Sequence, residues 1–411
     1  MYLCNEITAE MRRIIIKNIG PLQSVDIELA RVNVIIGPQS SGKSCVLKIA
    51  CYCTWVEKKI ELAQSANDFE NEDYFINELT RFHKLNGYFR KDSYMSYESD
   101  YMIFSYDAQA KKFSFNWKDG RWEYRRPKVS YIPAERNMVA AIPNWFDVKL
   151  YDDNIQSFMA DWDRARKNYT EHLDILNLGI SYKYDAQANK DRVEVDDNTT
   201  LELTNTSSGL QSLIPLYVHL NYIGNDIYHL QEAQSFTNIR LTEQFLKTLY
   251  DELFRKTGKT ESKSGSVTID EEGKRQISAS IVLAHIGPYL LAFGNEEYAE
   301  ECKLIYERYA KTASGEVFLE EPENNLFPPT QSRLVDWLLN LTEGEHANSF
   351  FIATHSPYVL GELLRKRTPM GLFFIYEKDD TTIVKTATDE DMQNIYDYGV
   401  DAFFNIENLV E

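Results

Sequence analysis

The sequence predicts an α/β protein in which a mixed sheet is joined to an antiparallel β subdomain and interrupted by an inserted, mostly helical lobe. Three observations predict it. An apolar strand, a glycine-rich loop and a helix follow one another over residues 31–64, residues 94–131 are aromatic and β-rich, and apolar strands with polar ends return after residue 316. We expect three parts, at 1–136, 137–310 and 311–411.

The glycine-rich loop carries the strongest motif of the chain. It reads Gly37, Pro38, Gln39, Ser40, Ser41, Gly42, Lys43, Ser44, which fits the phosphate-binding loop pattern at every fixed position. Glycines let backbone N–H groups cradle phosphate oxygens, the lysine reaches the β- and γ-phosphates, and the serine hydroxyl ligates Mg²⁺. The buried strand before it and the helix after it favour a nucleotide site over a plain glycine-rich turn.

The segments around the loop predict further elements. Residues 11–36 resemble a β-meander, and the helix after the loop is expected to continue to about Gln64. Asp119-Gly120 suggests the turn of a hairpin between residues 113–117 and 122–124. Basic residues interleave with aromatic ones over 111–128, which is typical of a nucleic-acid platform or of a half-buried strand with a solvated face.

Composition limits the function classes. The formal net charge of −19 gives no long-range attraction to DNA or to anionic membranes, so nucleic-acid binding would need a local basic patch or a partner. The most apolar run, 281–293, is shorter than a membrane span and is interrupted by His285, Gly287 and Pro288. Residues 1–6 do not resemble a signal peptide. We therefore expect a cytoplasmic protein without a membrane association.

The cysteines agree with that location. Cys4, Cys45, Cys51, Cys53 and Cys302 contain no Cys-x-x-Cys pair and are expected to be reduced thiols. Cys45 lies at the start of the helix after the loop, where a thiolate would be favoured, although a small packing residue is the simpler interpretation.

The middle of the chain is expected to be helical, with one β interruption at 180–203, a loop at 257–265 and a buried apolar stripe over 281–310. No heptad run long enough for an extended coiled coil is present.

Three further groups suit phosphate chemistry. Glu320-Glu321 follow an apolar strand, where one carboxylate could ligate Mg²⁺ and the other orient water, although a solvated acidic pair is an alternative. His355 follows another apolar strand, and it could either contact a phosphate or be a structural histidine. An apolar helix is preceded by Ser207-Ser208-Gly209-Leu210-Gln211. This segment could form an anion site or serve only as the N-cap of the helix.

The order of these motifs resembles the ABC-type ATPases of the SMC, Rad50 and RecF branch. Gly37–Ser44 resembles Walker A, residues 207–211 resemble the signature Leu-Ser-Gly-Gly-Gln, residues 317–322 resemble Walker B, and 324–326 resemble the D-loop. The segments Glu-Glu-Pro-Glu and Thr-His-Ser-Pro are similar to the corresponding segments of OLD-like ATPases of anti-phage defence, such as those of the PARIS and Septu systems. Arg136 stands roughly where the family's Q-loop would lie, but the glutamine is absent.

The resemblance implies a site and a mechanism. Cofactors would be ATP and Mg²⁺, with Ser44 and Glu320 as metal ligands and Lys43, Glu321 and His355 as catalytic residues. The nucleotide would be bound by residues 37–44, by Cys45, and by Ser207, Ser208, Gly209 and Gln211 of a second copy, which implies a homo-oligomer. Glu320 replaces the usual Asp, and Leu210 replaces the second signature glycine.

OLD nucleases carry a further acidic metal-binding domain, for which the residues after His355, including Asp379-Asp380 and 389–391, offer too little chain. We therefore expect an ATPase that senses phage and regulates a separate effector, a nuclease or toxin from the same operon. The alternatives are a RecF-like DNA-repair ATPase, which the net charge and the missing coiled coil disfavour, and a nucleotide-gated scaffold with little turnover.

Overall fold

The computed structural model describes residues 11–71, 73–196, 198–229, 236–260, 265–269, 275–279, 281–366, 369–378 and 381–399. The expectations for the N-terminal six residues, Cys4, part of the 257–265 loop and Asp379-Asp380 lie outside the described residues.

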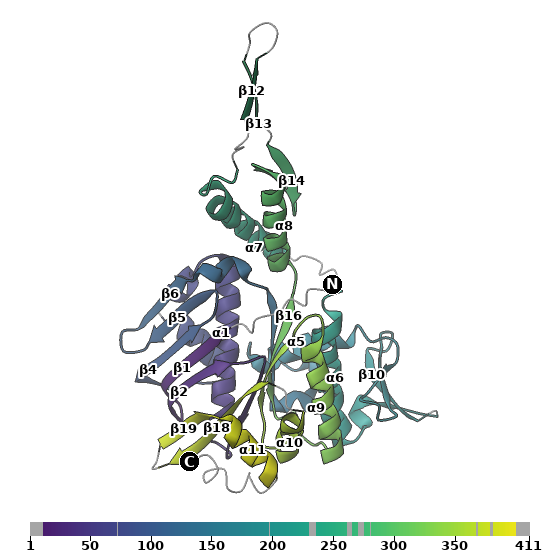
Figure 1. Ribbon diagram of the computed structural model, residues 1–411. Coiled ribbons are helices and arrows are strands. Elements are labelled where there is room, and N and C mark those ends of the chain that lie inside the picture. Colours follow the sequence, from purple (N-terminus) through teal and green to yellow (C-terminus); the bar gives the residue numbers. More distant parts are fainter. Residues whose placement is uncertain are drawn as a thin grey trace.

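One large mixed sheet organises the molecule (Figure 1). Within the described residues it has 11 strands in the order β6-β5-β4-β1-β2-β19-β18-β3-β17-β16-β7. The strands are β1 (Arg12–Ile19), β2 (Leu22–Leu29), β3 (Val32–Ile36), β4 (Phe89–Glu98), β5 (Met102–Asp107), β6 (Lys112–Trp117), β7 (Pro127–Ile132), β16 (Ser314–Glu320), β17 (Ser349–Ala353), β18 (Met370–Lys378) and β19 (Thr381–Thr386). β18, β3, β17, β16 and β7 are parallel, whereas β6 to β2 form an antiparallel wing. The predicted α/β class with an antiparallel subdomain is confirmed.

The parallel half of the sheet is covered on both faces. α1 (Lys43–Ala63) packs on one face in a core cluster with Ile35 and the inward residues of β1 and β2. α6 (Ser208–Asn221), α9 (Pro328–Glu343) and α10 (Pro357–Arg365) pack on the other face, where Val34 and Ile36 point. β3 is buried along its whole length because it is a central strand between two helical layers. The predicted meander therefore holds for β1 and β2 only, since β3 pairs with β17 and β18.

The predicted hairpin at Asp119-Gly120 is wrong. β6 pairs with β5, and residues 119–123 form a 3-10 turn, η1 (Asp119–Glu123). Arg121 lies over the rings of Trp117 and Trp122, 4.0 and 4.3 Å from their centroids, and donates to Glu252. Much of the basic stretch therefore makes internal contacts, while Lys111 and Lys112 are exposed. α2 (Asn67–Glu70) and α3 (Tyr74–Phe82) lie between α1 and this wing in the chain.

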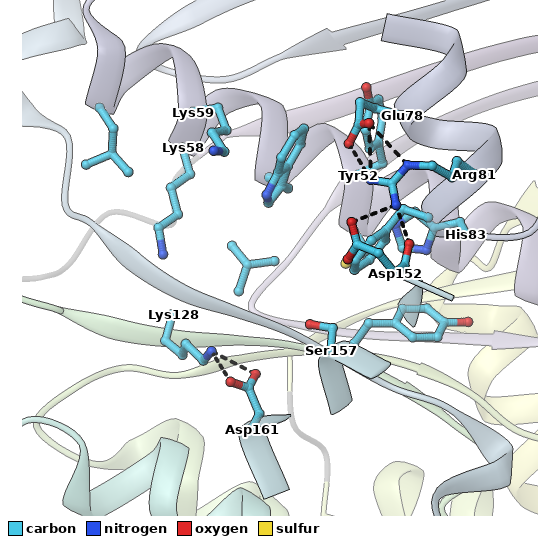
Figure 2. A pocket seen from close by; sticks show the side chains of 16 residues that line it. Tyr52, Lys58, Lys59, Glu78, Arg81, His83, Lys128, Asp152, Ser157 and Asp161 are labelled. Atoms are coloured by element: carbon cyan, nitrogen blue, oxygen red, sulfur yellow. Dashed lines mark hydrogen bonds and ion pairs between the residues drawn. The ribbon is translucent and has the colours of Figure 1, made fainter. Parts of the chain in front are cut away.

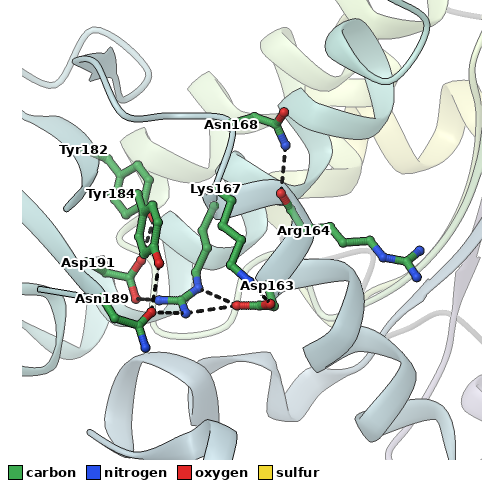
Figure 3. Close-up of polar contacts among 9 residues, drawn as sticks. Asp163, Arg164, Lys167, Asn168, Tyr182, Tyr184, Asn189 and Asp191 are labelled. Carbon is green, nitrogen blue, oxygen red and sulfur yellow. Dashed lines mark hydrogen bonds and ion pairs between the residues drawn. The ribbon is translucent and has the colours of Figure 1, made fainter. Parts of the chain in front are cut away.

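The lobe after β7 begins with η2 (Ala134–Asn137), α4 (Met138–Ala141), η3 (Trp145–Asp147) and α5 (Asn154–Arg166). A four-stranded sheet follows, formed by β8 (Leu173–Asp174), β9 (Ser181–Asp185), β10 (Lys190–Asp196) and β11 (Thr199–Glu202), and η4 (Leu203–Asn205) leads into α6. Arg166, at the end of α5, joins the helix to this sheet by donating to Asn189 and Asp191, and it also donates to Asp163 of its own helix. Figure 3 shows Asp163, Asn189 and Asp191 gathered at this contact. The hydroxyl groups of Tyr182 and Tyr184 donate to Asp191 and Asn189, which fixes the same carboxylate and amide from the sheet side.

An arm projects from the head beyond this lobe (Figure 1). η5 (Tyr222–Asp226) continues α6 and packs in the core cluster with β16 and α9. The arm contains α7 (Phe236–Leu249), η6 (Tyr250–Arg255), β12 (Gly265–Ile269), β13 (Arg275–Ala279), β14 (Val282–Ile286), β15 (Tyr289–Phe293) and α8 (Glu296–Ala310). The expectation of one β interruption is wrong, because β12–β13 and β14–β15 are two further hairpins. The apolar run 281–293 folds back at Gly287, where φ is 55°. The stripe expected to be buried over 281–310 is confirmed for Ile286, Phe293 and the inner face of α8, which form one core cluster, whereas Leu283 and Leu290 are 64% and 55% exposed.

α11 (Asp389–Tyr398) ends the described chain with a capping box at Thr388. No described helix combines the length and apolar character that crossing a membrane requires.

Candidate functional site

The phosphate-binding loop joins β3 to α1, as predicted. A Cβ at Gly37 would lie 2.0 Å from the Ile375 carbonyl oxygen, and Gly42 adopts a φ of 110°. Both positions therefore require glycine. Gly42 is the N-cap of α1 and no side chain caps the helix, so the backbone N–H groups at its start are available to an anion.

Lys43 is buried across this loop. Its ammonium donates to the carbonyl oxygens of Gly37 and Pro38 at 2.8 and 2.5 Å. Burial lowers the pKa of Lys43 to about 8, and the charges of Glu321 and Glu323 only partly offset that effect. The Ser41 hydroxyl is buried without a hydrogen-bond partner in the described structure. The loop thus holds a cation and a free hydroxyl where the sequence predicts a phosphate.

Strand register brings the other predicted groups to the same edge of the sheet. Ile35 of β3 pairs with Ala353 of β17, and Ala353 pairs with Glu320 of β16. Since these strands are parallel, the loop after β3, Glu321 after β16 and His355 after β17 lie at neighbouring strand ends. The sequence-predicted carboxylates and histidine are therefore brought together with the P-loop.

Glu320 and Glu321 have different environments. Glu320 is 7% exposed and its carboxylate accepts from the Ala134 backbone N–H at 3.3 Å. Glu321 has a half-exposed side chain and a left-handed backbone with φ of 44°, held by donation from its N–H to the Ala353 carbonyl oxygen at 2.8 Å. Burial, followed by the charges of Glu323 and Glu320, raises the pKa of Glu321. A strained backbone at a half-buried carboxylate is common where the carboxylate has a chemical task.

His355 faces Glu321. Its Nε2 lies 3.6 Å from Oε1 of Glu321. Burial, and then the charge of Lys43, lowers the pKa of His355, so the imidazole is neutral at neutral pH. A neutral imidazole can donate from one nitrogen and accept at the other.

Glu323 ties the loops after β16 and β17 together. Its carboxylate accepts from the Thr354 hydroxyl at 2.8 Å and from the His355 backbone N–H at 2.7 Å. Ser356 then caps α10 and donates to Gln331. These contacts fix the position of His355 relative to Glu321. Glu323 belongs to the Glu-Glu-Pro-Glu segment, but the sequence alone does not indicate its hydrogen-bond partners.

Arg136 organises the turn that carries both carboxylates. It is fully buried, and its guanidinium donates to the carbonyl oxygens of Glu320 and Glu321 at 2.8 and 2.7 Å. Longer contacts of 3.4 Å run to Pro133 and Pro322. Burial lowers the pKa of Arg136 to about 10, so it remains a cation. In the sequence, the position of Arg136 at the end of a strand is the one indication that it lies near the site. In the structure, Arg136 holds the backbone of Glu320 and Glu321.

The Ser207–Gln211 turn lies at the start of α6 and contacts the segment after Glu323. Ser207 caps the helix by accepting from the Leu210 N–H, and Ser208 is exposed. A Cβ at Gly209 would lie 3.2 Å from the Asn325 carbonyl oxygen. The Gln211 amide donates back to its own loop, at Thr204 and Thr206, so it supports the turn. Asn325 also donates to Ser212, at 2.8 Å.

Cys45 is a packing residue. Its side chain is 4% exposed, and burial raises the pKa of the thiol to about 12. The thiolate interpretation is therefore excluded, and only the backbone N–H of Cys45 remains for an anion.

The residues present fit a nucleotide with Mg²⁺. The buried Ser41 hydroxyl and the uncapped start of α1 suit phosphate oxygens, and the Ser44 hydroxyl and the Glu320 carboxylate are oxygen groups of the type that Mg²⁺ prefers. Among the described residues no three His, Cys, Asp or Glu side chains form a metal site. A Mg²⁺ ion that takes its other ligands from phosphate and water requires none.

Comparisons with known proteins give structural neighbours only. No family model matches the chain, and no curated protein matches it. It is similar to an SMC head bound to the C-winged helix domain of ScpA, with 9% identity and a TM-score of 0.44, covering 94% of this chain and 99% of that chain. The SMC head domain from Thermotoga maritima has 10% identity and a TM-score of 0.41, covering 92% and 99%. An SMC head domain with an extended coiled coil, bound to the C-terminal domain of ScpA derived from Pyrococcus furiosus, has 11% identity and a TM-score of 0.32, covering 94% and 98%. At these values the neighbours assign no role to any residue of this chain.

Proposed function

We propose that the protein is an ATPase of the ABC type that binds MgATP and hydrolyses the bond between the β- and γ-phosphates. One observation carries the proposal: a phosphate-binding loop, two carboxylates and an imidazole converge at the ends of three adjacent parallel strands. Each of these groups has a task in phosphoanhydride hydrolysis.

Binding would fall to the loop and to the first carboxylate. Lys43 would move from the Gly37 and Pro38 carbonyl oxygens to the β- and γ-phosphates, and the N–H groups at the start of α1 would bind phosphate oxygens. Ser44 and Glu320 would hold Mg²⁺, which when bound neutralises the charge that develops on the phosphates. Glu320 is one methylene longer than the usual Asp, and donation from Ala134 fixes its carboxylate.

Chemistry would fall to Glu321 and His355. Glu321 would orient a water and take its proton as the water oxygen bonds to the γ-phosphorus and the bridging bond breaks to release ADP. The raised pKa of Glu321 makes it a stronger base than an exposed carboxylate. His355, fixed through Glu323, would donate to the γ-phosphate.

The site would be completed by a second copy. Ser208 is exposed at the N-terminus of α6, where a helix dipole and backbone N–H groups suit an anion. In a homodimer, Ser208 and Gly209 of one copy would reach the γ-phosphate bound by the other. ATP would then bridge the two subunits, and hydrolysis would release them.

Phosphate release by the purified protein tests the catalytic proposal. Wild type and the exposed control Glu343→Gln should turn over ATP, whereas Lys43→Ala should neither bind nor hydrolyse it. Glu321→Gln should bind ATP normally, lose at least about a hundredfold in turnover, and form a dimer with ATP by light scattering. Equal turnover in Glu321→Gln and wild type would contradict the assigned role, and equal, near-zero rates would leave a nucleotide-gated scaffold.

We further propose that this ATPase regulates an effector, a nuclease or toxin encoded beside it, in anti-phage defence. Support comes from the Glu-Glu-Pro-Glu and Thr-His-Ser-Pro segments, which resemble those of OLD-like ATPases. Cells that express the chain with its neighbouring gene should show reduced phage plating, and Lys43→Ala should remove the protection. Unchanged plating would refute the defence role, while salt-dependent DNA binding by the purified chain would favour the RecF-like alternative.

A further inference from the structure

β7 is the last strand at one end of the large sheet, within the residues that the structure describes. It pairs with β16 on one side only. Helices cover both of its faces: Val129 and Tyr131 pack in the core cluster that contains α1, and on the opposite face Lys128 is bonded to Asp161 of α5. The open part of β7 is therefore its lateral edge.

Hydrogen bonds at the start of β7 show which main-chain groups face that edge. The Arg126 N–H donates to the Arg308 carbonyl oxygen at 3.5 Å, and the Arg126 carbonyl oxygen accepts from the Ala313 N–H at 2.8 Å. Ala313 directly precedes β16. The main chain of Arg126 therefore points toward β16.

Main-chain groups of successive residues point to opposite sides of a strand, so those of Pro127, Val129 and Tyr131 point to the open edge. Pro127 agrees with this, since it has no N–H, and its carbonyl oxygen accepts from Lys58 Nζ at 2.7 Å. Among the described residues, no hydrogen bond from outside the sheet reaches the main chain of Val129 or Tyr131. Each of these two residues therefore leaves one donor and one acceptor unused at the edge.

A cavity lies along this edge. Its volume is about 390 Å³, and residues of α1, α3, α5 and β7 line it, Val129 and Tyr131 among them. We name it the edge cavity. Figure 2 shows Lys58 on one side of it and Lys128 with Asp161 on the other. The edge cavity thus continues the layer of the sheet between two layers of helices, where a further strand would lie.

The acidic side chains that line the edge cavity are bonded to cations of the protein itself. Glu78 and Asp152 accept from Arg81, and both carboxylate oxygens of Asp161 accept from Lys128. Recognition by these side chains is therefore already satisfied. The unused hydrogen-bonding groups belong to the main chain of β7.

The two walls of the edge cavity differ in polarity. Cys51, Leu62 and Val129 line it on the side of α1, whereas Ser157 and Asp161 line it on the side of α5. A strand turns successive side chains to opposite faces. A strand in the edge cavity would therefore suit apolar and polar side chains in alternation.

The far end of β7 leads to the predicted ATP site. The Ala134 N–H donates to Glu320, and Arg136 donates to the carbonyl oxygens of Glu320 and Glu321. A contact that fixes β7 would therefore also fix the residues that hold these carboxylates.

We propose that the open edge of β7 is a docking site for an extended segment of a partner protein, which pairs with Val129 and Tyr131 as an added strand and alternates apolar and polar side chains. The main chain identifies this occupant, because donors and acceptors that alternate along an edge are complementary to another extended main chain. Docking would alter ATP turnover through Ala134 and Arg136, and this second step rests on the proposed ATPase function.

Binding is tested on the full chain with a library of hexapeptides in which Val, Ile, Leu or Phe alternates with Ser, Thr, Asn or Gln. Fluorescence anisotropy should show saturable binding of selected peptides, one per chain. N-methylation of every second amide removes the donors on one side of the peptide. One N-methylated set should bind at least about tenfold more weakly, and the complementary set should bind as before. Absence of any binder, or equal effects of the two sets, would overturn strand pairing.

The position of the site is tested with two variants and with hydrogen exchange. Ser157→Trp, which fills the edge cavity from an exposed position on α5, should abolish binding, whereas Gln156→Trp, an exposed neighbour that does not line the cavity, should not. Bound peptide should slow exchange of the Val129 and Tyr131 amides at least about tenfold, with little change at Ser130, which points toward β16. Binding that survives Ser157→Trp, or unchanged exchange at Val129 and Tyr131, would overturn the site.

Coupling to the ATP site is a separate result. A selected peptide should change the ATP turnover of the wild-type protein at least about twofold, and Ser157→Trp should remove that change. A peptide that binds without altering turnover would refute the coupling. Peptide binding to a chain that shows no ATP turnover would refute the proposed ATPase function and leave the docking site intact.

Discussion

Replacing Arg136 by methionine should both destabilise the protein and inactivate it. The guanidinium makes two short hydrogen bonds, at 2.8 and 2.7 Å, to the carbonyl oxygens of Glu320 and Glu321. Hydrogen bonds to a charged group contribute about 1.5–3 kcal/mol each, so the pair accounts for about 3–6 kcal/mol. Removing the buried cation also relieves its desolvation cost, and we expect a net loss of about 3–5 kcal/mol in the free energy of unfolding.

The Arg136→Met variant should lose ATP turnover even under conditions in which it remains folded. Without Arg136, the left-handed conformation of Glu321 loses one of its supports. The bond from its N–H to the Ala353 carbonyl oxygen and the bond from the Asn324 N–H to its own carbonyl oxygen remain. The carboxylate would then leave its position facing His355.

Urea denaturation, with the midpoint and slope measured together, checks the stability change, and phosphate release under conditions where the variant is folded checks the activity. Arg164→Met is the matched control, since the Arg164 side chain is 70% exposed and 3.8 Å from its carboxylate partner. A folded Arg136→Met protein with a stability within about 1 kcal/mol of wild type and unchanged turnover would refute the reasoning.

Three further predictions concern the same site and its surroundings. The affinity for ATP should fall as pH rises above about 8, because Lys43 has a pKa of about 8 in the free protein and only its charged form attracts phosphate. Titration calorimetry should show proton uptake on ATP binding, and Lys43→Arg should remove that uptake. An ATP affinity of wild type that stays constant from pH 7 to 9 would contradict this. Glu321→Gly should be at least as stable as Glu321→Gln, since glycine adopts a φ of 44° without strain; a lower thermal midpoint for the glycine variant would show that the turn is not strained. Arg121→Ala should destabilise by roughly 2 kcal/mol through lost contacts with two tryptophans and Glu252, whereas Lys111→Ala should have almost no effect; equal effects in urea denaturation would argue that the basic stretch is surface only.

Local patterns predicted much of the fold. β3, the P-loop and α1 form as expected because an unbroken apolar strand, fixed glycines and a helical apolar period agree with one another. Glu321 and His355 were found because each follows an apolar strand, and parallel register alone then brings them together.

Other features depend on contacts that no local pattern contains. The donors around Glu320 come from Arg136 and Ala134, about 185 residues earlier in the chain. The Asp119-Gly120 turn signal failed because Arg121 is held between two tryptophans and Glu252, which favours a 3-10 turn over a hairpin. The run 281–293 has no strand alternation strong enough to reveal a hairpin, and its turn at Gly287 was interpreted only as a break.

The most direct test of the two-copy site is to mix two inactive variants. Lys43→Ala lacks a working P-loop, and Ser208→Arg blocks the opposing turn, so each alone should be inactive. In a mixed dimer, one composite site is intact, and an equal mixture should recover about a quarter of wild-type turnover if subunits exchange freely and the two sites act independently. Turnover in the mixture no higher than the sum of the separate variants would contradict an ATP site shared between two copies.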